Sequence, residues 1–329
     1  MPDDVALHAT NGPLLAGFRV RDDRVERLSW PPPSQDAQGW DWLHLDRTHT
    51  ETEPYLRHTL GLPEQVVDGL LDTETRPRLT RTAEGLLLIL RGINFNMGYP
   101  PENMVALRVW ITPRTVVTLR RLPVLSVHAL QEAYERGEGS RTVGTFLVDL
   151  IEHMVDQVDD VVGDTMEEID ALEENVLEHG GGADVSRRLP DLRRRLVRLR
   201  RYLAPQRDAL NALGRSGGDV LSETDRLDLN ESAEQCQRYV EEMESARERA
   251  VILQDELNHQ ADARVSRHSY ILSIAAGVFL PITFLTGLLG INVGGIPGAN
   301  DPQGFWIVVG LCVVIAIAAV GFLIGRRWV

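Results

Sequence analysis

Residues 271–289 read ILSIAAGVFLPITFLTGLL and residues 305–325 read FWIVVGLCVVIAIAAVGFLIG. Neither stretch contains a charged residue. Because an α-helix needs about 20 apolar residues to cross a bilayer, each stretch is long enough for one transmembrane helix. One such run could be the core helix of a globular domain. Two in tandem, joined by a short segment rich in Gly and Pro, instead predict a membrane protein with two spans.

The placement of arginines predicts how these spans are oriented. Arg264 and Arg267 precede the first span, Arg326 and Arg327 follow the second, and the connecting residues 291–304 contain no basic residue. Basic residues gather beside the cytoplasmic ends of transmembrane helices. We therefore expect both termini in the cytoplasm and the connecting loop on the outer side.

The overall charge narrows the range of partners. The chain has 329 residues, with 48 acidic and 34 basic side chains and a formal net charge of −14. All of its basic residues other than histidine are arginines. Such an acidic balance argues against nucleic acid as a partner and suits a protein that gathers cations. The two cysteines, Cys236 and Cys312, are far apart in sequence and suggest no disulfide framework.

Residues 1–140 have the pattern of an α/β domain. Short β-rich runs at 42–46, 86–93, 104–112 and 115–119 alternate with turn signals and with helical patterns near 53–59 and 124–135.

From Thr142 onward the pattern is helical. An acidic helix over 149–178, a Gly-Gly-Gly turn and an arginine-rich helix predict an antiparallel hairpin with complementary charge. A further helix begins near Ser222, where the sequence resembles a capping box, and runs directly into the first span.

These patterns predict an α+β membrane protein with an N-terminal cytoplasmic α/β domain, a long helical stalk and two C-terminal transmembrane helices. We expect six segments: the α/β domain (1–140), the stalk (141–270), the first span (271–290), the outer loop (291–304), the second span (305–325) and a cytoplasmic tail (326–329).

A stripe of polar and small residues follows the long helix at heptad-like spacing. Its members are Asp255, His259, Asp262, Ser266, Ser269, Ser273, Ala276, Leu280, Thr283 and Gly287. Lipid offers no hydrogen bonds, so a polar stripe within a span must face protein or water. Two spans cannot enclose water alone. The stripe therefore predicts either several copies around a central pore or a close-packed helix interface without conduction, and spacing alone leaves both open.

The stripe ends at Gly290, Ile291 and Asn292, a Gly-x-Asn tripeptide that closes the first of two C-terminal spans. In that position the tripeptide resembles the signature of the CorA superfamily of divalent-cation transporters. Residues 279–298 (FLPITFLTGLLGINVGGIPG) are similar to the zinc-transporter, or ZntB, branch of that superfamily. Residues 42–46 (WLHLD), 75–78 (TRPR) and 200–208 (RRYLAPQRD) also resemble this branch. The likeness extends over nearly the whole chain.

The resemblance implies a homopentameric funnel in the bacterial inner membrane, with the pore lined by the first span. It implies that Asn292 forms a ring at the outer mouth and holds the ion through its hydration shell. Thr283 would add a hydroxyl ring and Leu280 a hydrophobic constriction. Asp255 and Asp262 would form a cytoplasmic vestibule that concentrates cations.

The resemblance also implies which ions are carried. The transported ion would be Zn²⁺, with Co²⁺, Ni²⁺, Cd²⁺ and Mg²⁺ as further candidates and no permanently bound cofactor. The magnesium branch has Met-Pro-Glu-Leu after the tripeptide, whereas this loop has Gly295, Ile296, Pro297 and Gly298. The missing glutamate favours the zinc branch, for which proton coupling is a family-level expectation.

The histidines are weaker signals. His259 lies on the stripe between two aspartates, and histidine titrates near neutral pH, so we predict that Asp255, His259 and Asp262 carry the pH dependence of transport; the alternative is a solvated stalk histidine. His44 with His49 is one of the nearest approaches to a zinc-ligand spacing, although surface histidines are commoner.

Residues 214–218 match the Gly-x-Ser-x-Gly pattern of hydrolases but join two helices, so we expect no enzyme activity.

Overall fold

The computed structural model describes residues 12–22, 24–34, 39–291 and 302–325. The chain divides into two compact units, Met1–Leu253 and Gln254–Val329, and each is described by itself.

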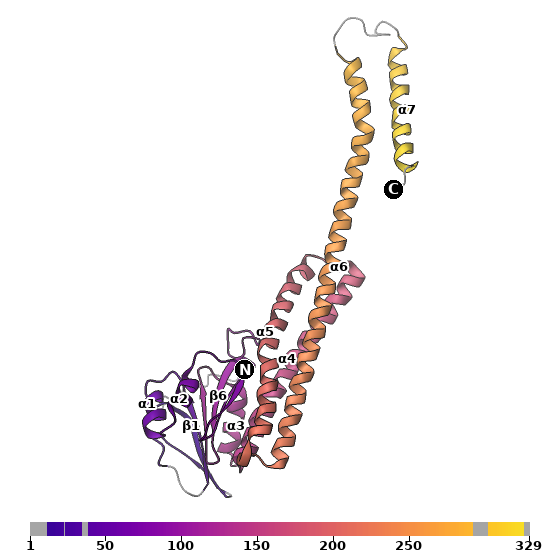
Figure 1. Cartoon of the computed structure of the whole chain (residues 1–329). Helices are drawn as coiled ribbons and strands as arrows, with labels where there is room; N and C mark the ends of the chain where they lie inside the picture. Colours follow the sequence, from indigo (N-terminus) through magenta and orange to yellow (C-terminus); the bar gives the residue numbers. More distant parts are fainter. Residues whose placement is uncertain (1–11, 23, 35–38, 292–301, 326–329) are drawn as a thin grey trace. The chain divides into compact units, whose positions relative to one another are not determined.

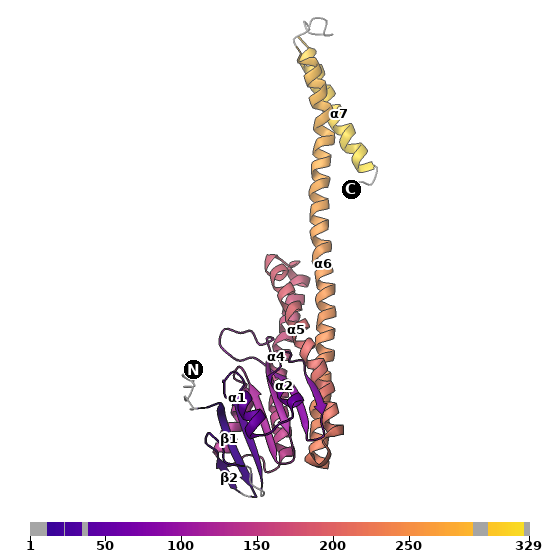
Figure 2. The same ribbon diagram turned by 60° about the vertical axis from the view of Figure 1, so that its left-hand side comes forward.

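The first unit contains a seven-stranded sheet with the strand order β2-β1-β3-β7-β6-β5-β4 (Figures 1 and 2). Neighbouring strands are antiparallel except for the parallel pair β3 and β7. The strands are β1 (Leu14–Arg21), β2 (Arg24–Arg27), β3 (Trp40–Asp46), β4 (Arg78–Arg81), β5 (Leu86–Gly92), β6 (Val105–Ile111) and β7 (Thr115–Arg120). The four strands predicted from the sequence are confirmed as β3, β5, β6 and β7, while β1, β2 and β4 were not predicted.

Helices cover both faces of this sheet (Figure 1). On one face lie α1 (Thr52–Pro54), the π-helical turn η1 (Tyr55–Thr59) and α2 (Glu64–Leu71). On the other lie α3 (Leu125–Glu135), α4 (Val143–His179) and α5 (Ala183–Ser216). A short 3₁₀ turn, η2 (Gly218–Val220), precedes α6 (Glu223–Leu289), which begins in the first unit and continues into the second.

Strand β3 shows how the two faces are filled. Successive side chains of a strand point to opposite faces, and both faces of β3 are buried. Leu43 and Leu45 belong to the apolar core that includes Leu56 and Val67 from η1 and α2. Trp42 lies on the other face, with its ring centroid 4.9 Å from that of Phe146. The tryptophans and leucines of WDWLHLD let the sequence identify this strand, although Asp41, His44 and Asp46 interrupt the apolar run.

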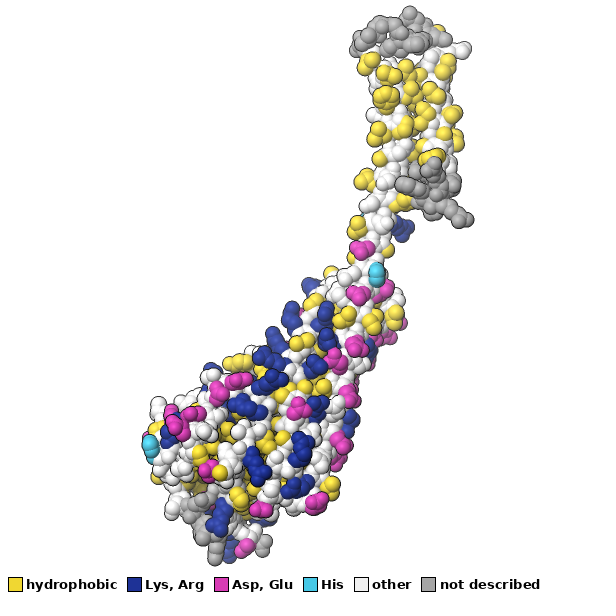
Figure 3. Space-filling view, in the orientation of Figure 1, with side chains coloured by type: hydrophobic (Ala, Val, Ile, Leu, Met, Phe, Trp, Pro, Cys, Tyr) yellow, Lys and Arg dark blue, Asp and Glu magenta, His cyan; other side chains and the backbone are white. Residues whose placement is uncertain are grey.

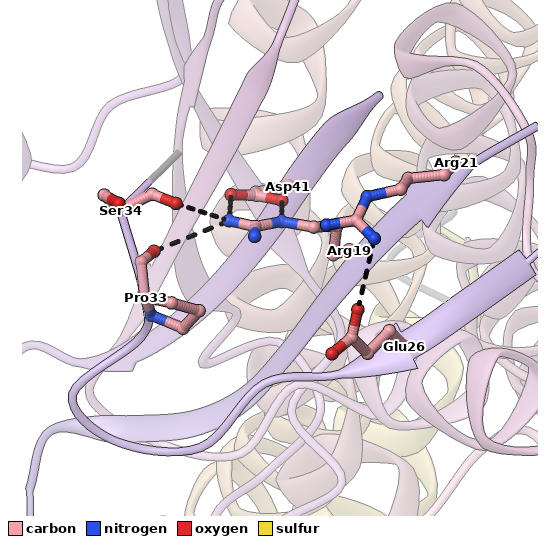
Figure 4. A network of polar contacts seen from close by, with 6 residues as sticks. All are labelled: Arg19, Arg21, Glu26, Pro33, Ser34 and Asp41. Atoms are coloured by element: carbon pink, nitrogen blue, oxygen red, sulfur yellow. Dashed lines mark hydrogen bonds and ion pairs between the residues drawn. The ribbon is translucent and has the colours of Figure 1, made fainter. Parts of the chain in front are cut away.

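A buried ion pair connects β1 and β3 (Figure 4). Arg19 donates from Nε to Asp41 Oδ1 at 2.7 Å and from Nη2 to Asp41 Oδ2 at 2.9 Å. The same Nη2 donates to the carbonyl oxygen of Ser34 at 3.1 Å. Because desolvation offsets much of the attraction between buried charges, this pair acts mainly by fixing the position of the segment that contains Ser34 against the sheet.

The predicted charge-complementary hairpin is confirmed. Helix α4 ends at His179, and Gly180 follows in the left-handed conformation with φ of 67°. Glu168 on α4 accepts from Arg188 at 3.1 Å and from Arg195 at 2.8 Å, both on α5. At the start of α6, the Asp225 amide donates to Ser222 Oγ at 3.1 Å while Asp225 Oδ2 accepts from the Ser222 amide at 2.8 Å. This reciprocal pair is the capping box expected there.

The second unit consists of the C-terminal part of α6 and helix α7 (Gly304–Gly325). Both α6 and α7 contain a window long and apolar enough to cross a membrane, and neither window is buried. Figure 3 shows hydrophobic side chains covering this unit. Exposed apolar surface of this extent needs lipid or other copies of the chain to cover it.

Candidate pore-lining face

The predicted stripe lies entirely on α6, within the second unit. All ten of its residues are exposed in the single chain: Asp255, His259, Asp262, Ser266, Ser269, Ser273, Ala276, Leu280, Thr283 and Gly287. At about 100° of rotation per residue, steps of three and four keep these positions on one side of an α-helix. The structure therefore places the predicted residues on one exposed face.

The opposite side of α6 is partly covered. Its half-buried positions in the span are Ile274, Ala275, Val278, Ile282, Leu285 and Leu289. Those of α7 also recur at helical spacing and are Gly304, Val308, Cys312, Ile315, Ala316 and Ala319. The two helices lie side by side in Figure 1, whereas in Figure 2 α7 diverges from α6 toward its C-terminal end. Because these half-buried positions are apolar, α6 turns an apolar side toward α7 and leaves the stripe uncovered.

The hydroxyl groups of the span are bonded in part within their own helix. Ser273 Oγ donates to the carbonyl oxygen of Ser269 at 2.8 Å. Thr286 Oγ1, beside the stripe, donates to the carbonyl oxygen of Ile282 at 3.0 Å. Each of these oxygens keeps acceptor capacity after donating its single hydrogen. A wet passage and a packed helix interface can both use such a surface, so these bonds do not decide between them.

The two arginines near the start of the first span lie off the stripe. Asp255, His259 and Asp262 lie on the stripe, whereas Arg264 and Arg267 lie on the other side of α6 at about 100° per residue. The same arginines carry the predicted orientation of the spans. Their spacing places Arg264 and Arg267 away from Asp255, His259 and Asp262, on the side of α6 that also contains the exposed Glu256.

The described residues of a single chain bring no metal site together. Among the residues that the structure describes, no three His, Cys, Asp or Glu side chains lie close enough to hold a metal ion. Asp255, His259 and Asp262 are therefore spaced along one helix face rather than gathered around one point. Copies of the chain around a common axis would be needed to turn each position into a ring.

The signature tripeptide is only partly within the described residues. Gly290 follows the end of α6, and its amide donates to the carbonyl oxygen of Thr286 at 2.8 Å. Ile291 is exposed. Asn292, the rest of the predicted outer loop up to residue 301, and the tail at 326–329 lie outside the described residues.

His44 is a structural histidine and not a metal ligand. Its Nδ1 is 2.8 Å from Thr118 Oγ1, and its Nε2 accepts from Arg120 Nε at 3.1 Å. Burial, together with the charge of Arg120, lowers the pKa of His44 to about 3. Both ring nitrogens are engaged by the protein, so the pairing with His49 considered above does not form a zinc site.

Together, these features define a class: an α/β domain with a helical hairpin, followed by two membrane-spanning helices, one of which carries an exposed polar face. Residues 37–326 match the family described as CorA-like Mg²⁺ transporter protein. The chain belongs to this family.

Two relatives align with most of the chain. The divalent cation transporter CmaX of Pseudomonas aeruginosa is 42% identical over 288 residues, covering 87% of this chain and 86% of the relative. The zinc transport protein ZntB of Yersinia enterocolitica is 36% identical over 287 residues, covering 87% of each chain.

Solved structures show the same fold. Full-length CmaX aligns with a TM-score of 0.82 at 38% identity and covers 96% of this chain and 97% of its own. The CorA magnesium transporter of Methanocaldococcus jannaschii aligns with a TM-score of 0.80 at 20% identity, covering 95% and 97% respectively. The resemblance to the CorA superfamily is thereby confirmed.

Proposed function

We propose that this protein carries divalent metal cations across the bacterial inner membrane, with zinc as the preferred ion and protons as the coupling ion. The observation that carries the proposal is an exposed polar face on a membrane-length helix in a chain of the CorA-like family. Both termini lie in the cytoplasm in this proposal, because arginines precede the first span and follow the second, and basic residues gather on the cytoplasmic side of a membrane.

The transporting unit is a homopentamer in which five copies of the stripe surround one passage. Two spans per chain leave the stripe uncovered, and symmetric copies can cover it while keeping water beside it. Leu280 forms a hydrophobic constriction and Thr283 a hydroxyl ring. At the cytoplasmic end, rings of Asp255 and Asp262 raise the local cation concentration. Asn292 forms the outer ring, where amide oxygens bind the hydration shell of the arriving ion.

Zinc is the preferred ion because the outer loop lacks the glutamate of the magnesium branch and contains Asp301 as its one acidic residue. The similarity to a protein named as a zinc transporter supports the same choice. A magnesium or cobalt channel of the same architecture is the second candidate, and the Mg²⁺ in the family's description favours it. In both cases the metal is cargo, and the chain needs no resident cofactor.

His259 is the proposed origin of the pH dependence. It is exposed on the stripe, and Asp255 and Asp262 lie about one helical turn before and after it. Protonation would add positive charge to the vestibule and lower its attraction for cations. We expect His259→Ala to flatten the pH profile of zinc flux in proteoliposomes. An unchanged profile would show that His259 is a solvated stalk residue.

Zinc uptake into liposomes, measured with and without a pH gradient, tests the proposal. A proton-coupled zinc transporter accumulates zinc when the gradient is present and loses that accumulation when the gradient is collapsed. A channel gives flux that follows voltage and ignores the pH gradient, and repeating the assay with magnesium or cobalt identifies its ion. A membrane-anchored sensor gives no flux, which would refute transport altogether.

A further inference from the structure

A cavity of about 460 Å³ in the first unit is lined by four arginines from separate parts of the chain. Arg91 lies on β5 and Arg108 on β6, while Arg47 and Arg121 follow β3 and β7. The register aligns Arg91 with Ala106, so Arg91 and Arg108 share one face of the sheet. Strand order therefore gathers positive charge that the sequence disperses over 75 residues. None of the described residues that line the cavity has a carboxylate.

Arg108 is the most enclosed of these side chains, with 3% of its surface exposed. Its Nη2 donates to the carbonyl oxygen of Asp72 at 2.8 Å. Its Nε is buried and has no hydrogen-bond partner among the described residues, and the same is true of Arg47 Nε. A buried donor without a partner is costly, and more so when it is charged. Arg108 thus lines the cavity with a guanidinium whose buried Nε has no partner among the described residues.

Arg91 is held in place by neutral groups. Its Nε donates to the carbonyl oxygen of Thr75 at 3.0 Å, and its guanidinium lies 4.3 Å from the ring centroid of Tyr202. Its Nη1 donates to the carbonyl oxygen of Met104. Carbonyl oxygens and an aromatic face orient a guanidinium without cancelling its full charge, so Arg91 is positioned but not neutralised.

The nearby carboxylates are engaged by other arginines. Asp72 Oδ2 lies 3.6 Å from Arg78 Nη2, and Glu102 Oε1 lies 3.7 Å from Arg198 Nη1. Burial and the charges of Arg47 and Arg91 lower the pKa of Arg108 to about 10, which still leaves it charged at neutral pH. The balance around the cavity is therefore positive, although the protein as a whole has a net charge of −14.

Arginines also line two neighbouring cavities, which in addition contain Glu102 and Glu74 respectively. These two cavities, of about 390 and 540 Å³, share Arg91 and extend to Arg201 on α5. Figure 3 shows basic side chains along this helix. The combined surface is larger than one monovalent anion requires, and each cavity lies within the size range of small-molecule sites.

We infer that this arginine-lined cavity binds a small phosphorylated polyanion, of the class of pyrophosphate and nucleoside polyphosphates. Guanidinium groups match phosphate oxygens with paired hydrogen bonds, and several converging arginines select for multiple negative charges. The exposed Tyr99 and Asn103 at the same cavity offer a ring and an amide to the remainder of an organic phosphate. This inference does not depend on the proposed transport function.

Titration calorimetry on the purified full-length chain, with no divalent cation in the buffer, tests it. The probes are inorganic pyrophosphate and ATP, with sulfate and chloride compared at equal ionic strength. We expect saturable binding of at least one phosphate probe, and binding of sulfate and chloride at least tenfold weaker. No saturable binding of either phosphate probe, or chloride binding of equal affinity, would overturn the inference.

Two variants and a matched control locate the site. Arg108→Gln and Arg121→Gln should each weaken binding of the phosphate probe by about tenfold or more, since each removes a charged hydrogen-bond donor. The exposed Arg215 lies outside the cavity, so Arg215→Gln makes the same change in net charge and should leave affinity unchanged. If Arg108→Gln does not fold, Arg121→Gln, at an exposed position, decides the question. Equal weakening by Arg121→Gln and Arg215→Gln would contradict a specific site.

Discussion

The two units differ in how they bury apolar side chains, as one tryptophan from each unit shows. Trp42 in the first unit is 0% exposed and is surrounded by Phe18, Tyr134 and Phe146, whereas Trp306 in the second unit is 71% exposed. The first unit contains its own apolar core. The second presents its apolar side chains outward and depends on lipid or other copies of the chain to cover them. Changes in the first unit should therefore act on folding, and changes in the second on transport.

The largest effect is expected at the signature tripeptide. Asn292→Ala removes the amide that is proposed to bind the ion's hydration shell, so zinc flux into proteoliposomes should be nearly abolished. Pentamers, measured by light scattering in detergent, should persist because the substitution leaves the apolar sequences of both spans unchanged. Wild-type flux in this variant would remove Asn292 from the mechanism, and loss of pentamers would indicate a structural role instead.

The two tryptophans provide the next test. Trp42→Ala should lower the free energy of unfolding of the first unit by about 3–5 kcal/mol, because it opens a cavity in a packed core. It also leaves Thr118 Oγ1 without the Trp42 Nε1 donor at 2.9 Å. Hydrogen exchange of strands β1 and β7 reports this loss. Trp306→Ala is the control and should leave that exchange unchanged; equal effects would show that the two units are not independent in stability.

A smaller effect is expected on acidification. Folded His44 has a pKa of about 3 and stays neutral, whereas the unfolded chain takes up a proton below about pH 6.5. Acid therefore favours the unfolded form, by about 1.4 kcal/mol per pH unit below 6.5, and about 2 kcal/mol should be lost by pH 5. Above pH 6.5 this residue contributes no pH dependence.

His44→Gln isolates that contribution, since the amide can still bond Thr118 and Arg120 but does not titrate. The stability of this variant, measured by urea unfolding, should fall less steeply between pH 6.5 and pH 5 than that of the wild type. His58→Gln changes an exposed histidine and should keep the wild-type slope. Parallel slopes for wild type and His44→Gln would refute the assignment.

The fold was predictable where hydropathy or periodicity is strong. The two spans, the long α6, the hairpin turn at Gly180 and the strands β3, β5, β6 and β7 all follow from such patterns. Strands β2 (RVER) and β4 (RLTR) have no apolar pattern and form because a neighbouring strand offers an edge. Strand β1 contains Gly17 and Arg19, and the partners that allow Arg19 to be buried, Asp41 on β3 and the carbonyl oxygen of Ser34, are distant from it in sequence.

The two candidate sites also differ in how far the sequence predicts them. All residues of the stripe lie on one helix, so their spacing in the sequence predicts their arrangement in space. The arginine-lined cavity is assembled from four segments by strand order, which the sequence does not reveal. A signal was nevertheless present, because Arg91 and Arg108 each interrupt an otherwise apolar strand (LLLILRG and VALRVWI). A charged residue in such a run is rarely buried without a partner.

The central claim is that the stripe on α6 faces water shared by several copies of the chain. Leu280 on the stripe and Ile317 on α7 are equally exposed in the single chain, at 69% and 67%, so they form a matched pair. In a background with Cys236 and Cys312 replaced by alanine, Leu280→Cys and Ile317→Cys can be treated with a water-soluble thiol reagent during zinc flux. We predict modification and loss of flux at position 280 and neither at position 317. Equal reactivity at both positions, or none at position 280, would contradict a wet passage along this face.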